Sequence, residues 1–269
     1  MVRVEREKFP YYQFEHLSGS PGICHFVSSG KKNIGFTDGI DPDEIRRNRQ
    51  DLAECVGIDA GNLVSAHQIH SANVTVVTSR EAGRGALDKE SRLPDTDAMI
   101  TNEEEICLMV LSADCVPVLL YDPVNRVIAA VHAGWRGTAA KIVVETVRAM
   151  QEKYGCKPEH LLAGIGPSIG SCCFEVGQEV ADVFQGLFPE SQSLVKATAP
   201  VGKFHVDLWE INRRELLDAG LHAENIEIAR LCSVCHSDHF FSYRRDGQTA
   251  GRFGAGIALS GAQRVKNEK

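Results

Sequence analysis

Four short apolar runs follow one another in the middle of the chain. They are "AMIT" at 98–101, "ICLMVLSA" at 106–113, "VPVLLYD" at 116–122 and "VIAAVHA" at 127–133. Short apolar runs bounded by turn signals predict buried strands. Because the runs are continuously apolar rather than alternating, they indicate sheets covered on both faces. Further strands are predicted over 62–79 (two strands about a short turn), 161–166, 226–232 and 252–259.

Helical patterns occur before, between and after these runs. The stretches concerned are 41–57, 137–155, 177–188 and 207–220. In the first stretch, Asp41 or Asp43 is a suitable residue to begin the helix and Gly57 a suitable residue to end it. Thr138 and Gly155 are expected to play the same two parts in the second stretch. Residues 81–97 are polar and rich in turn residues, which predicts an exposed loop.

Composition narrows the class of protein. The chain has 36 acidic and 29 basic residues and a formal net charge of −7, which argues against a nucleic-acid backbone or an anionic membrane as its main partner. No apolar run is long enough to span a membrane, and the charged start "MVRVEREKFPYYQFEHL" is unlike a signal peptide. We therefore expect a cytoplasmic protein whose nine cysteines are reduced and serve as core thiols, metal ligands or nucleophiles.

The turn "YDPVNR" between two of the apolar runs predicts a hairpin. If its loop runs from Asp122 to Asn125, Cys115 lies directly opposite His132, with Cβ atoms roughly 4.5–5.5 Å apart. Such a pair suits a Cys–His nucleophile, two of the three protein ligands of a catalytic zinc ion, or a cysteine packed in the core. His67 and His70 are both candidates for a third ligand. Because positions three apart on a strand point to opposite faces, only one of them is expected to serve.

Several motifs together resemble one known family. They are "HQIHSANV", "TDAMIT", "LSADCVPVLLYDP", "AAVHAGWRGT", "GIGPSIGSCCFEVG" and "FFSYRRDGQTAGRFG", which extend from about residue 64 to 257. With these motifs the chain resembles the laccase-domain family, also called multicopper polyphenol oxidoreductases. Members of that family are described as purine nucleoside phosphorylases. The resemblance implies one α+β domain over residues 1–269. Its fold would be a four-layer α/β/β/α arrangement with mixed sheets, similar to cytotoxic-necrotizing-factor-type cysteine hydrolases.

The resemblance also implies a site and an activity. Zinc would be held by His70, Cys115 and His132. Of the two candidate histidines, the resemblance therefore selects His70 and not His67. The activity implied is phosphorolysis of adenosine, inosine and methylthioadenosine, with adenosine deamination as a second activity. The partners would be a purine nucleoside and phosphate, and the protein would be a monomer or a homodimer. Copper could occupy the same site because Cu(II) binds such ligands more tightly than zinc.

Two other chemistries compete with this interpretation. One is a Cys–His hydrolase or deamidase with Cys115 as nucleophile and His132 as base. The other is a copper-dependent polyphenol oxidase, which is disfavoured because the sequence contains no His-x-His pair of the kind that multicopper sites use.

Further polar residues are candidates for catalysis or substrate binding. Arg136 follows His132 by four residues, and the arginines of "SYRRD" offer a bidentate clamp for an anion, although arginine clusters are often only surface ion pairs. The full set of candidates is Gln68, Asn48, Arg49, Asp114, Arg136, Tyr243, Arg244 and Arg245. "CSVCH" at 232–236 matches a haem-attachment pattern, but this is disfavoured without an export signal. Its C-x-x-C by itself supplies only half of a zinc site.

Overall fold

Two large mixed sheets form the centre of the protein. The computed structural model describes residues 1–30, 32–37, 39–190 and 192–260. The first sheet has the order β1 (Val2–Val4), β2 (Tyr11–Gln13), β3 (Ile23–Ser28), β15 (Phe253–Leu259), β7 (Cys107–Ser112), β4 (Leu63–Val64). The second has the order β14 (Ile226–Ile228), β10 (Leu162–Ile165), β8 (Val116–Asp122), β9 (Val127–Ala133), β6 (Ala98–Thr101), β5 (Val74–Val76).

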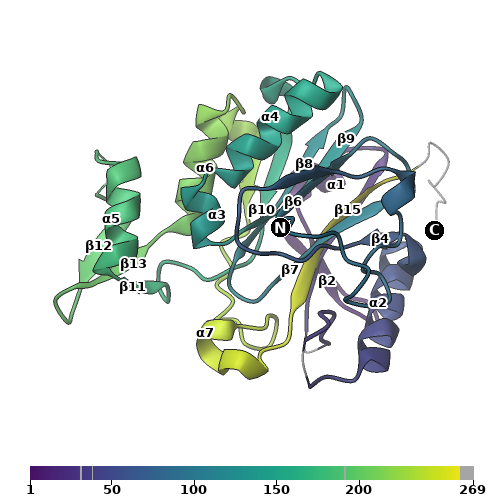
Figure 1. Ribbon diagram of the computed structural model, residues 1–269, viewed down its shortest axis with the longest axis horizontal. Coiled ribbons are helices and arrows are strands. Elements are labelled where there is room, and N and C mark those ends of the chain that lie inside the picture. The colour runs from purple at the N-terminus through teal and green to yellow at the C-terminus, as the bar shows by residue number, and fades with distance from the viewer. Residues whose placement is uncertain (31, 38, 191, 261–269) are drawn as a thin grey trace.

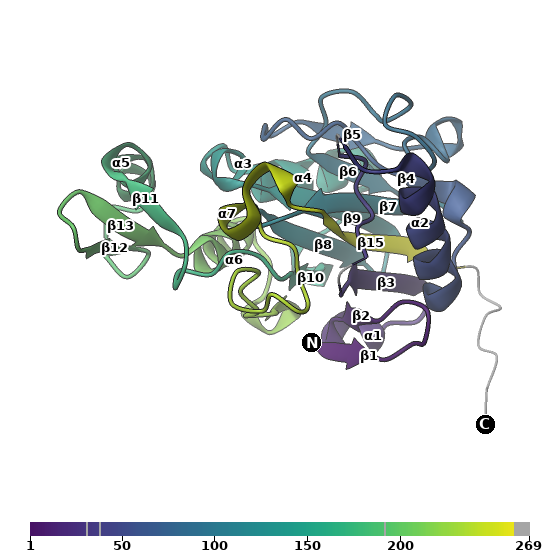
Figure 2. The same cartoon turned by 90° about the horizontal axis from the view of Figure 1, so that it is seen from below.

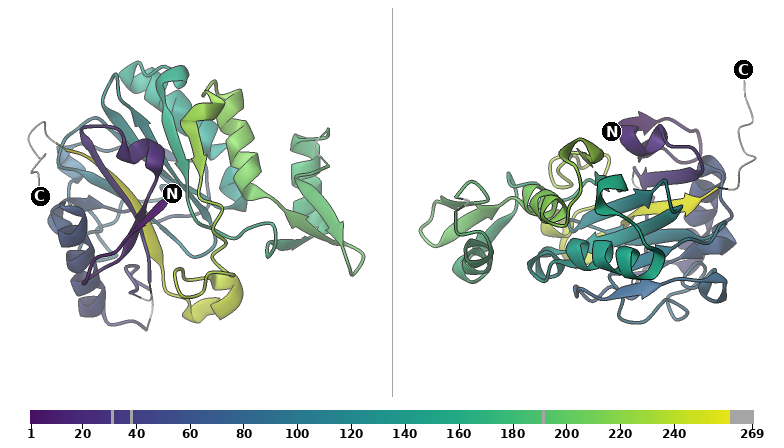
Figure 3. Two further views of the ribbon diagram at one scale, coloured as in Figure 1. Left: turned by 180° about the vertical axis from the view of Figure 1, so that it is seen from behind. Right: turned by 90° about the horizontal axis from the view of Figure 1, so that it is seen from above.

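The packing of the core shows four layers. Leu119 and Ile128 of the β8–β9 hairpin pack against Leu108 of β7, between the two sheets. The opposite face of the hairpin packs under the helices α4 (Ile142–Tyr154) and α6 (Leu208–Asp218). On the far side of the first sheet lies α2 (Pro42–Val56) (Figures 1 and 3). This confirms the α/β/β/α arrangement and explains why the hairpin strands are apolar on both faces.

The helices begin and end at chemically suitable residues. Asp41 caps α2 by accepting the backbone N–H of Asp43, and Gly57 ends it with a φ of 78°. The predicted helix over 137–155 is in fact two helices, α3 (Trp135–Ala139) and α4. The break is at Lys141, whose φ of 60° lies in the left-handed region. The remaining helices are α1 (Glu15–Ser18), α5 (Gln178–Leu187) and α7 (Tyr243–Asp246).

Thr138 therefore does not cap the long helix, contrary to the prediction. It lies inside α3, and its hydroxyl accepts a hydrogen bond from Asn212 of α6 at 3.1 Å. Gly155 does end α4, with a φ of 68°.

A smaller unit projects from the two-sheet body. It consists of the three-stranded sheet β11 (Glu175–Gly177), β13 (Lys203–Val206), β12 (Val195–Thr198) with α5 against it (Figure 2). The sequence analysis predicted α5 but not these three strands, nor β1, β2 and β3. No helix of the described residues is long and apolar enough to cross a membrane.

The β8–β9 hairpin differs in register from the prediction. Pro117, not Cys115, pairs with His132, and the last pair before the turn is Asp122 with Val127. The turn is displaced because the Asp122 carboxylate accepts the backbone N–H of Val124 at 2.8 Å. Since the difference is two residues, side chains keep their face. Cys115 thus lies just before β8 and on the same side of the hairpin as His132.

Candidate metal and ligand site

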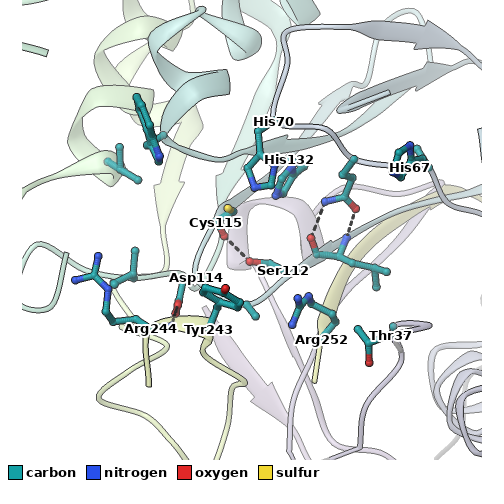
Figure 4. A pocket seen from close by; sticks show the side chains of 18 of the residues that line it. Thr37, His67, His70, Ser112, Asp114, Cys115, His132, Tyr243, Arg244 and Arg252 are labelled. Atoms are coloured by element: carbon teal, nitrogen blue, oxygen red, sulfur yellow. Dashed lines mark hydrogen bonds between the residues drawn. The ribbon is translucent and has the colours of Figure 1, made fainter. Parts of the chain in front are cut away.

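Three side chains from three separate segments converge where β8 begins and β9 ends, in the middle of the second sheet. His132 is on β9, Cys115 lies in the loop between β7 and β8, and His70 lies in the loop between β4 and β5. Their ligand atoms all lie within 4.8 Å of one another, and Figure 4 shows the side chains pointing toward a common centre. We call these residues the three-residue site. Its composition and open side match a catalytic metal centre that leaves a position for water or substrate.

His67 does not join this group. Its imidazole is exposed and lies 3.2 Å from the Asp95 carboxylate. Figure 4 shows His67 apart from the other three side chains. The segment 65–73 is irregular rather than a strand, and His70 has a φ of 63°. The argument from strand periodicity therefore did not apply, although its outcome, one histidine toward the site and one away, holds.

A buried carboxylate supports two of the three ligands. Asp97 Oδ1 lies 2.8 Å from His132 Nδ1 and accepts the backbone N–H of His70 at 3.0 Å. Its second oxygen accepts the backbone N–H and the hydroxyl of Ser71, both at 2.7 Å. With Nδ1 of His132 donating to Asp97, Nε2 is the nitrogen left for a metal, the usual carboxylate–histidine–metal arrangement.

Asp97 is also the main residue that sequence reasoning missed. It belongs to the stretch 81–97, predicted to be an exposed loop, yet its side chain is fully buried. The stretch has no strand and only a short 3-10 turn, as expected, but its last residues turn into the core. The signal available in the sequence was the position of Asp97 inside "TDAMIT", immediately before a buried strand.

The charges around the three-residue site favour the thiolate form of Cys115. Burial alone would raise the pKa of Cys115, but the neighbouring His132 and His70 outweigh it and lower that pKa. Burial would lower the pKa of His132, yet Cys115 and Asp97 raise it. For Asp97, donors from His132 and Ser71 overcome burial and lower the pKa to about 2. A deprotonated cysteine is the form that binds metals or attacks electrophiles.

A cavity of about 500 Å³ opens beside the three-residue site. Its apolar lining includes the aromatic residues Phe36, Trp135 and Phe174. Polar groups line the rest, among them Arg252 and the side chain of Thr37 (Figure 4). The volume and the mixture of apolar walls with a few polar groups suit a small organic ligand.

Four of the candidates line this cavity. They are Gln68, Asp114, Tyr243 and Arg244. The Gln68 amide both donates to and accepts from the backbone of Leu111 at 2.8 Å, which fixes the loop that carries His70. Asp114 accepts the Ser233 hydroxyl and the Arg244 backbone N–H, both at 2.6 Å.

Arg244 is held by backbone carbonyls rather than by a carboxylate. Its guanidinium donates to the carbonyls of Cys173 at 3.1 Å and Glu175 at 3.0 Å, and lies 5.7 Å from the ring centre of Phe174. Tyr243 is half exposed at the mouth of the cavity. Both are placed to contact a ligand.

The other candidates lie outside the cavity. Arg136 is exposed, and its guanidinium lies 4.4 Å from the ring centre of Trp135. Arg136 belongs to α3 and is not among the residues that line the cavity, so its part in substrate binding stays a prediction. Arg245 pairs with Asp246 at 2.7 Å and donates to carbonyls of the 233–240 segment, a structural role.

Asn48 and Arg49 are buried in α2 and do not reach the cavity. Asn48 donates to the carbonyl of Asn33 at 2.8 Å, and Arg49 to that of Ile34 at the same distance. They hold the segment that leads to Phe36, and thus position a cavity wall. Arg252, which does line the cavity, was missed as a site residue, although it stands within the quoted motif "TAGRFG".

Comparison with known proteins identifies the family to which the chain belongs. The profile of the family described as "Multi-copper polyphenol oxidoreductase laccase" matches residues 25–260. A protein of Bacteroides thetaiotaomicron named purine nucleoside phosphorylase is 37% identical, with 96% of this chain and 99% of that protein aligned. A protein named adenosine deaminase RL5, from an unknown prokaryotic organism, is 36% identical over 83% of this chain and 86% of its own length.

Solved structures share the whole fold. The crystal structure of YlmD from Geobacillus stearothermophilus superposes with a TM-score of 0.89 at 31% identity, covering 96% of this chain and 98% of that one. The hypothetical protein YfiH of Bacillus licheniformis gives a TM-score of 0.88 at 30% identity, covering 95% and 98%. The match of sequence profile, relatives and structure over nearly the entire chain shows that this protein belongs to the multi-copper polyphenol oxidoreductase laccase family.

Proposed function

We propose that this protein is a zinc-dependent purine nucleoside phosphorylase acting on adenosine, inosine and methylthioadenosine. The main support for the proposal is that the three-residue site opens into a cavity of about 500 Å³, whose lining includes aromatic residues and arginines. The relatives named purine nucleoside phosphorylase support the choice of substrate.

The residues of the three-residue site suit a zinc ion better than they suit the copper cluster of a multicopper oxidase. One thiolate and two imidazoles are common zinc ligands, with an open fourth position in catalytic sites. Of the two groups of metal-capable side chains in the described part of the chain, only this one contains histidine. Multicopper oxidases need additional histidine clusters. Copper in place of zinc at this one site remains a second option to be tested by metal analysis.

Phosphorolysis requires three things of the protein. Phosphate must be held against C1′ of the ribose, the base must be oriented, and water must be kept away. When bound, the metal would act as a Lewis acid on a substrate or phosphate oxygen. Arg252 lines the cavity and donates through Nη1 to the carbonyls of Ala250 and Gly251, and we assign the N–H groups of its Nε and Nη2 to phosphate. The aromatic wall around Phe174 would hold the purine by stacking.

Adenosine deamination is a second candidate activity. A relative of comparable identity is named adenosine deaminase. Deamination needs an activated water and a carboxylate that moves protons, and Asp114 is a carboxylate at the cavity. Both of its oxygens already accept short hydrogen bonds, however, so phosphorolysis is the preferred assignment.

A Cys–His hydrolase is the competing enzyme class. The lowered pKa of Cys115 beside His132 would also suit a nucleophile. The metal assignment is preferred because His70 adds a third ligand atom, which a Cys–His nucleophile does not need.

One incubation series separates these activities. Zinc-replete protein would be mixed with adenosine, with and without phosphate, and the products separated by chromatography. We expect adenine and ribose 1-phosphate only when phosphate is present. Inosine formed without phosphate would identify a deaminase instead. If neither product forms, the nucleoside proposal fails, and covalent labelling of Cys115 by an electrophile in metal-free protein would favour the hydrolase.

A further inference from the structure

A second group of metal-capable side chains lies apart from the three-residue site. Cys172 and Cys173 stand in the loop before β11, and Cys232 and Cys235 in the turn after β14. All four sulfur atoms lie within 4.8 Å of one another. We call these residues the four-cysteine cluster. By itself the C-x-x-C pair supplies only half of a zinc site. The fold brings a second pair of cysteines to it, which precede Cys235 by 62 and 63 positions in the sequence.

The spacing of the sulfurs suits a shared metal ion. Sγ of Cys235 lies 3.7 Å from that of Cys172 and 3.5 Å from that of Cys173. Four sulfurs at Zn–S distances of about 2.3 Å in a tetrahedron are about 3.8 Å apart. A disulfide would instead bring two sulfurs to about 2.05 Å, and all four cysteines are free. Four cysteines around one ion form a closed, structural type of zinc site.

The surroundings suit the charge that such a site would carry. Zinc with four thiolates has two net negative charges. The backbone N–H of Gly170 donates to Sγ of Cys232 at 3.3 Å. The guanidinium of Arg244 reaches the carbonyl of Cys173 at 3.1 Å, and that of Arg245 reaches the carbonyl of Ser233 at 3.1 Å. A backbone donor thus contacts one sulfur directly, and two arginines of α7 donate to carbonyls of the two loops that carry the cysteines.

Gly170 shows how closely the cluster is packed. A Cβ on this residue would lie 2.8 Å from the ring of Trp209 and 3.3 Å from Sγ of Cys172. Since Cβ atoms essentially never approach a ring so closely, only glycine fits without a shift in its neighbours. The close packing fixes where the two cysteine-bearing loops meet.

We propose that the four-cysteine cluster binds a structural zinc ion, which ties the 170–174 loop to the 231–236 turn. The connection between the loop and the turn also supports the cavity. Phe174 directly follows Cys173 and lines the cavity wall. The hydroxyl of Ser233, in the turn, holds Asp114 at 2.6 Å. Bound zinc would thus hold one wall of the cavity in place without contacting a ligand. The proposal does not depend on the reaction proposed above.

Metal analysis of three proteins tests the proposal. Wild type, Cys172→Ser/Cys235→Ser and Cys115→Ala would be produced with zinc under reducing conditions and dialysed against metal-free buffer. Cys172 and Cys235 are the two exposed members of the cluster, so serine disturbs packing least there, and circular dichroism would verify folding. We expect the double variant to hold one zinc ion fewer than wild type. Equal zinc in wild type and the double variant would overturn the proposal.

X-ray absorption on the Cys115→Ala protein gives a second readout that leaves the cluster intact. Its remaining zinc should show four sulfur ligands at about 2.3 Å. A shell that contains nitrogen, or a Cys172–Cys235 or Cys173–Cys235 disulfide found by mass spectrometry in protein never exposed to oxidant, would contradict the zinc assignment. Failure of the three-residue site is distinguishable, because then Cys115→Ala would hold as much zinc as wild type while the double variant would still lose it.

Discussion

The three-residue site and the four-cysteine cluster differ in where their ligands stand. The three-residue site lies at the end of β9, an interior strand of the second sheet, with His132 on that strand and Asp97 buried behind it. The four-cysteine cluster is carried by loops, and two of its sulfurs belong to exposed residues. At the three-residue site the buried Asp97 carboxylate holds His132 and the backbone of His70 in place. At the four-cysteine cluster, hydrogen bonds from Gly170, Arg244 and Arg245 hold the two loops.

This difference indicates which role a metal ion would have at the three-residue site and at the four-cysteine cluster. A preorganised set of three ligands beside a cavity leaves one position open for chemistry. A closed set of four ligands leaves none and contributes only to folding. We therefore expect changes at the three-residue site to affect activity much more than stability, and changes at the four-cysteine cluster to show the reverse.

The largest effect on activity is expected from Cys115→Ala. The change removes one of three ligands, and with it Lewis-acid assistance worth several kcal/mol. Since each 1.36 kcal/mol is tenfold in rate, kcat/KM for phosphorolysis should fall about a thousandfold. The measurement is steady-state kinetics with metal analysis on the same sample. Cys55→Ala removes a half-buried thiol from α2 and serves as the control. Full activity of Cys115→Ala would disprove the assignment of the site.

Gly134→Ala should damage the three-residue site without removing a ligand. A Cβ at Gly134 would lie 2.7 Å from Cδ2 of His70 and 3.0 Å from Sγ of Cys115, so both ligands must shift. A displacement of about 1 Å can cost about a hundredfold in rate. The expected result is a loss of that order in kcat with little change in thermal stability.

Gly170→Ala is the matched change at the four-cysteine cluster. Its Cβ would press on Trp209 and on Cys172. We expect it to lower the melting temperature more than Gly134→Ala does, and to lower kcat less. Melting curves and kinetics on both variants decide the matter. If the two glycine variants lose activity and stability in the same proportion, the division between a catalytic and a structural site is wrong.

The two regions also differ in how well the sequence predicted them. The strands of the core were predicted because uninterrupted apolar runs have few alternatives to a buried sheet. The hairpin placed Cys115 and His132 on one side although the Asp122 turn displaced its register by two residues. The choice of His70 over His67 came from the family motifs. The strands β1, β2 and β3 were missed because the chain there is mixed in character, and β1 and β2 have three residues each.

Contacts between distant segments were beyond sequence reasoning. The "CC" and C-x-x-C pairs are visible in the sequence, but only the fold brings them together. The same holds for Asp97, whose polar neighbours suggested solvent, and for Arg252, which reaches the cavity where Arg136 does not. Side-chain direction after a strand end depends on the next element, and α3 turns Arg136 outward.

Asp97→Asn tests how far preorganisation explains the three-residue site. The amide would keep the shape but lose the negative charge that holds His132 Nδ1–H and the backbone around His70. Loss of such a supporting group costs about 10–100-fold in metal affinity. Competition with a zinc chelator measures this. Asp95→Asn is the control, since Asp95 is exposed and its carboxylate faces His67, which is not one of the three ligands. Equal affinity of Asp97→Asn and Asp95→Asn would contradict the role of the buried carboxylate.

A buried carboxylate outside both sites gives a contrast to Asp97. Glu215 of α6 is 2% exposed, and neither carboxylate oxygen has a hydrogen-bond partner in the described part of the chain. Burial raises its pKa from 4.5 to about 8. Below pH 4.5 the group is protonated whether the protein is folded or unfolded, so it has no effect on stability. Between pH 4.5 and 8 only the unfolded chain releases the proton, and the folded state loses stability as pH rises.

Glu215→Gln removes this titration and should therefore stabilise the protein at alkaline pH. The gain over wild type should grow from pH 5 to pH 8, reaching about 4 kcal/mol in the free energy of unfolding, since each pKa unit corresponds to about 1.36 kcal/mol. Urea unfolding at several pH values measures it, with Glu210→Gln, a partly exposed ion-paired residue on the same helix, as control. Metal content and kcat should not change, because Glu215 belongs to neither site. A pH-independent difference would mean that Glu215 is ionised in the folded protein, as Asp97 is, and that burial without hydrogen bonds does not separate the two carboxylates.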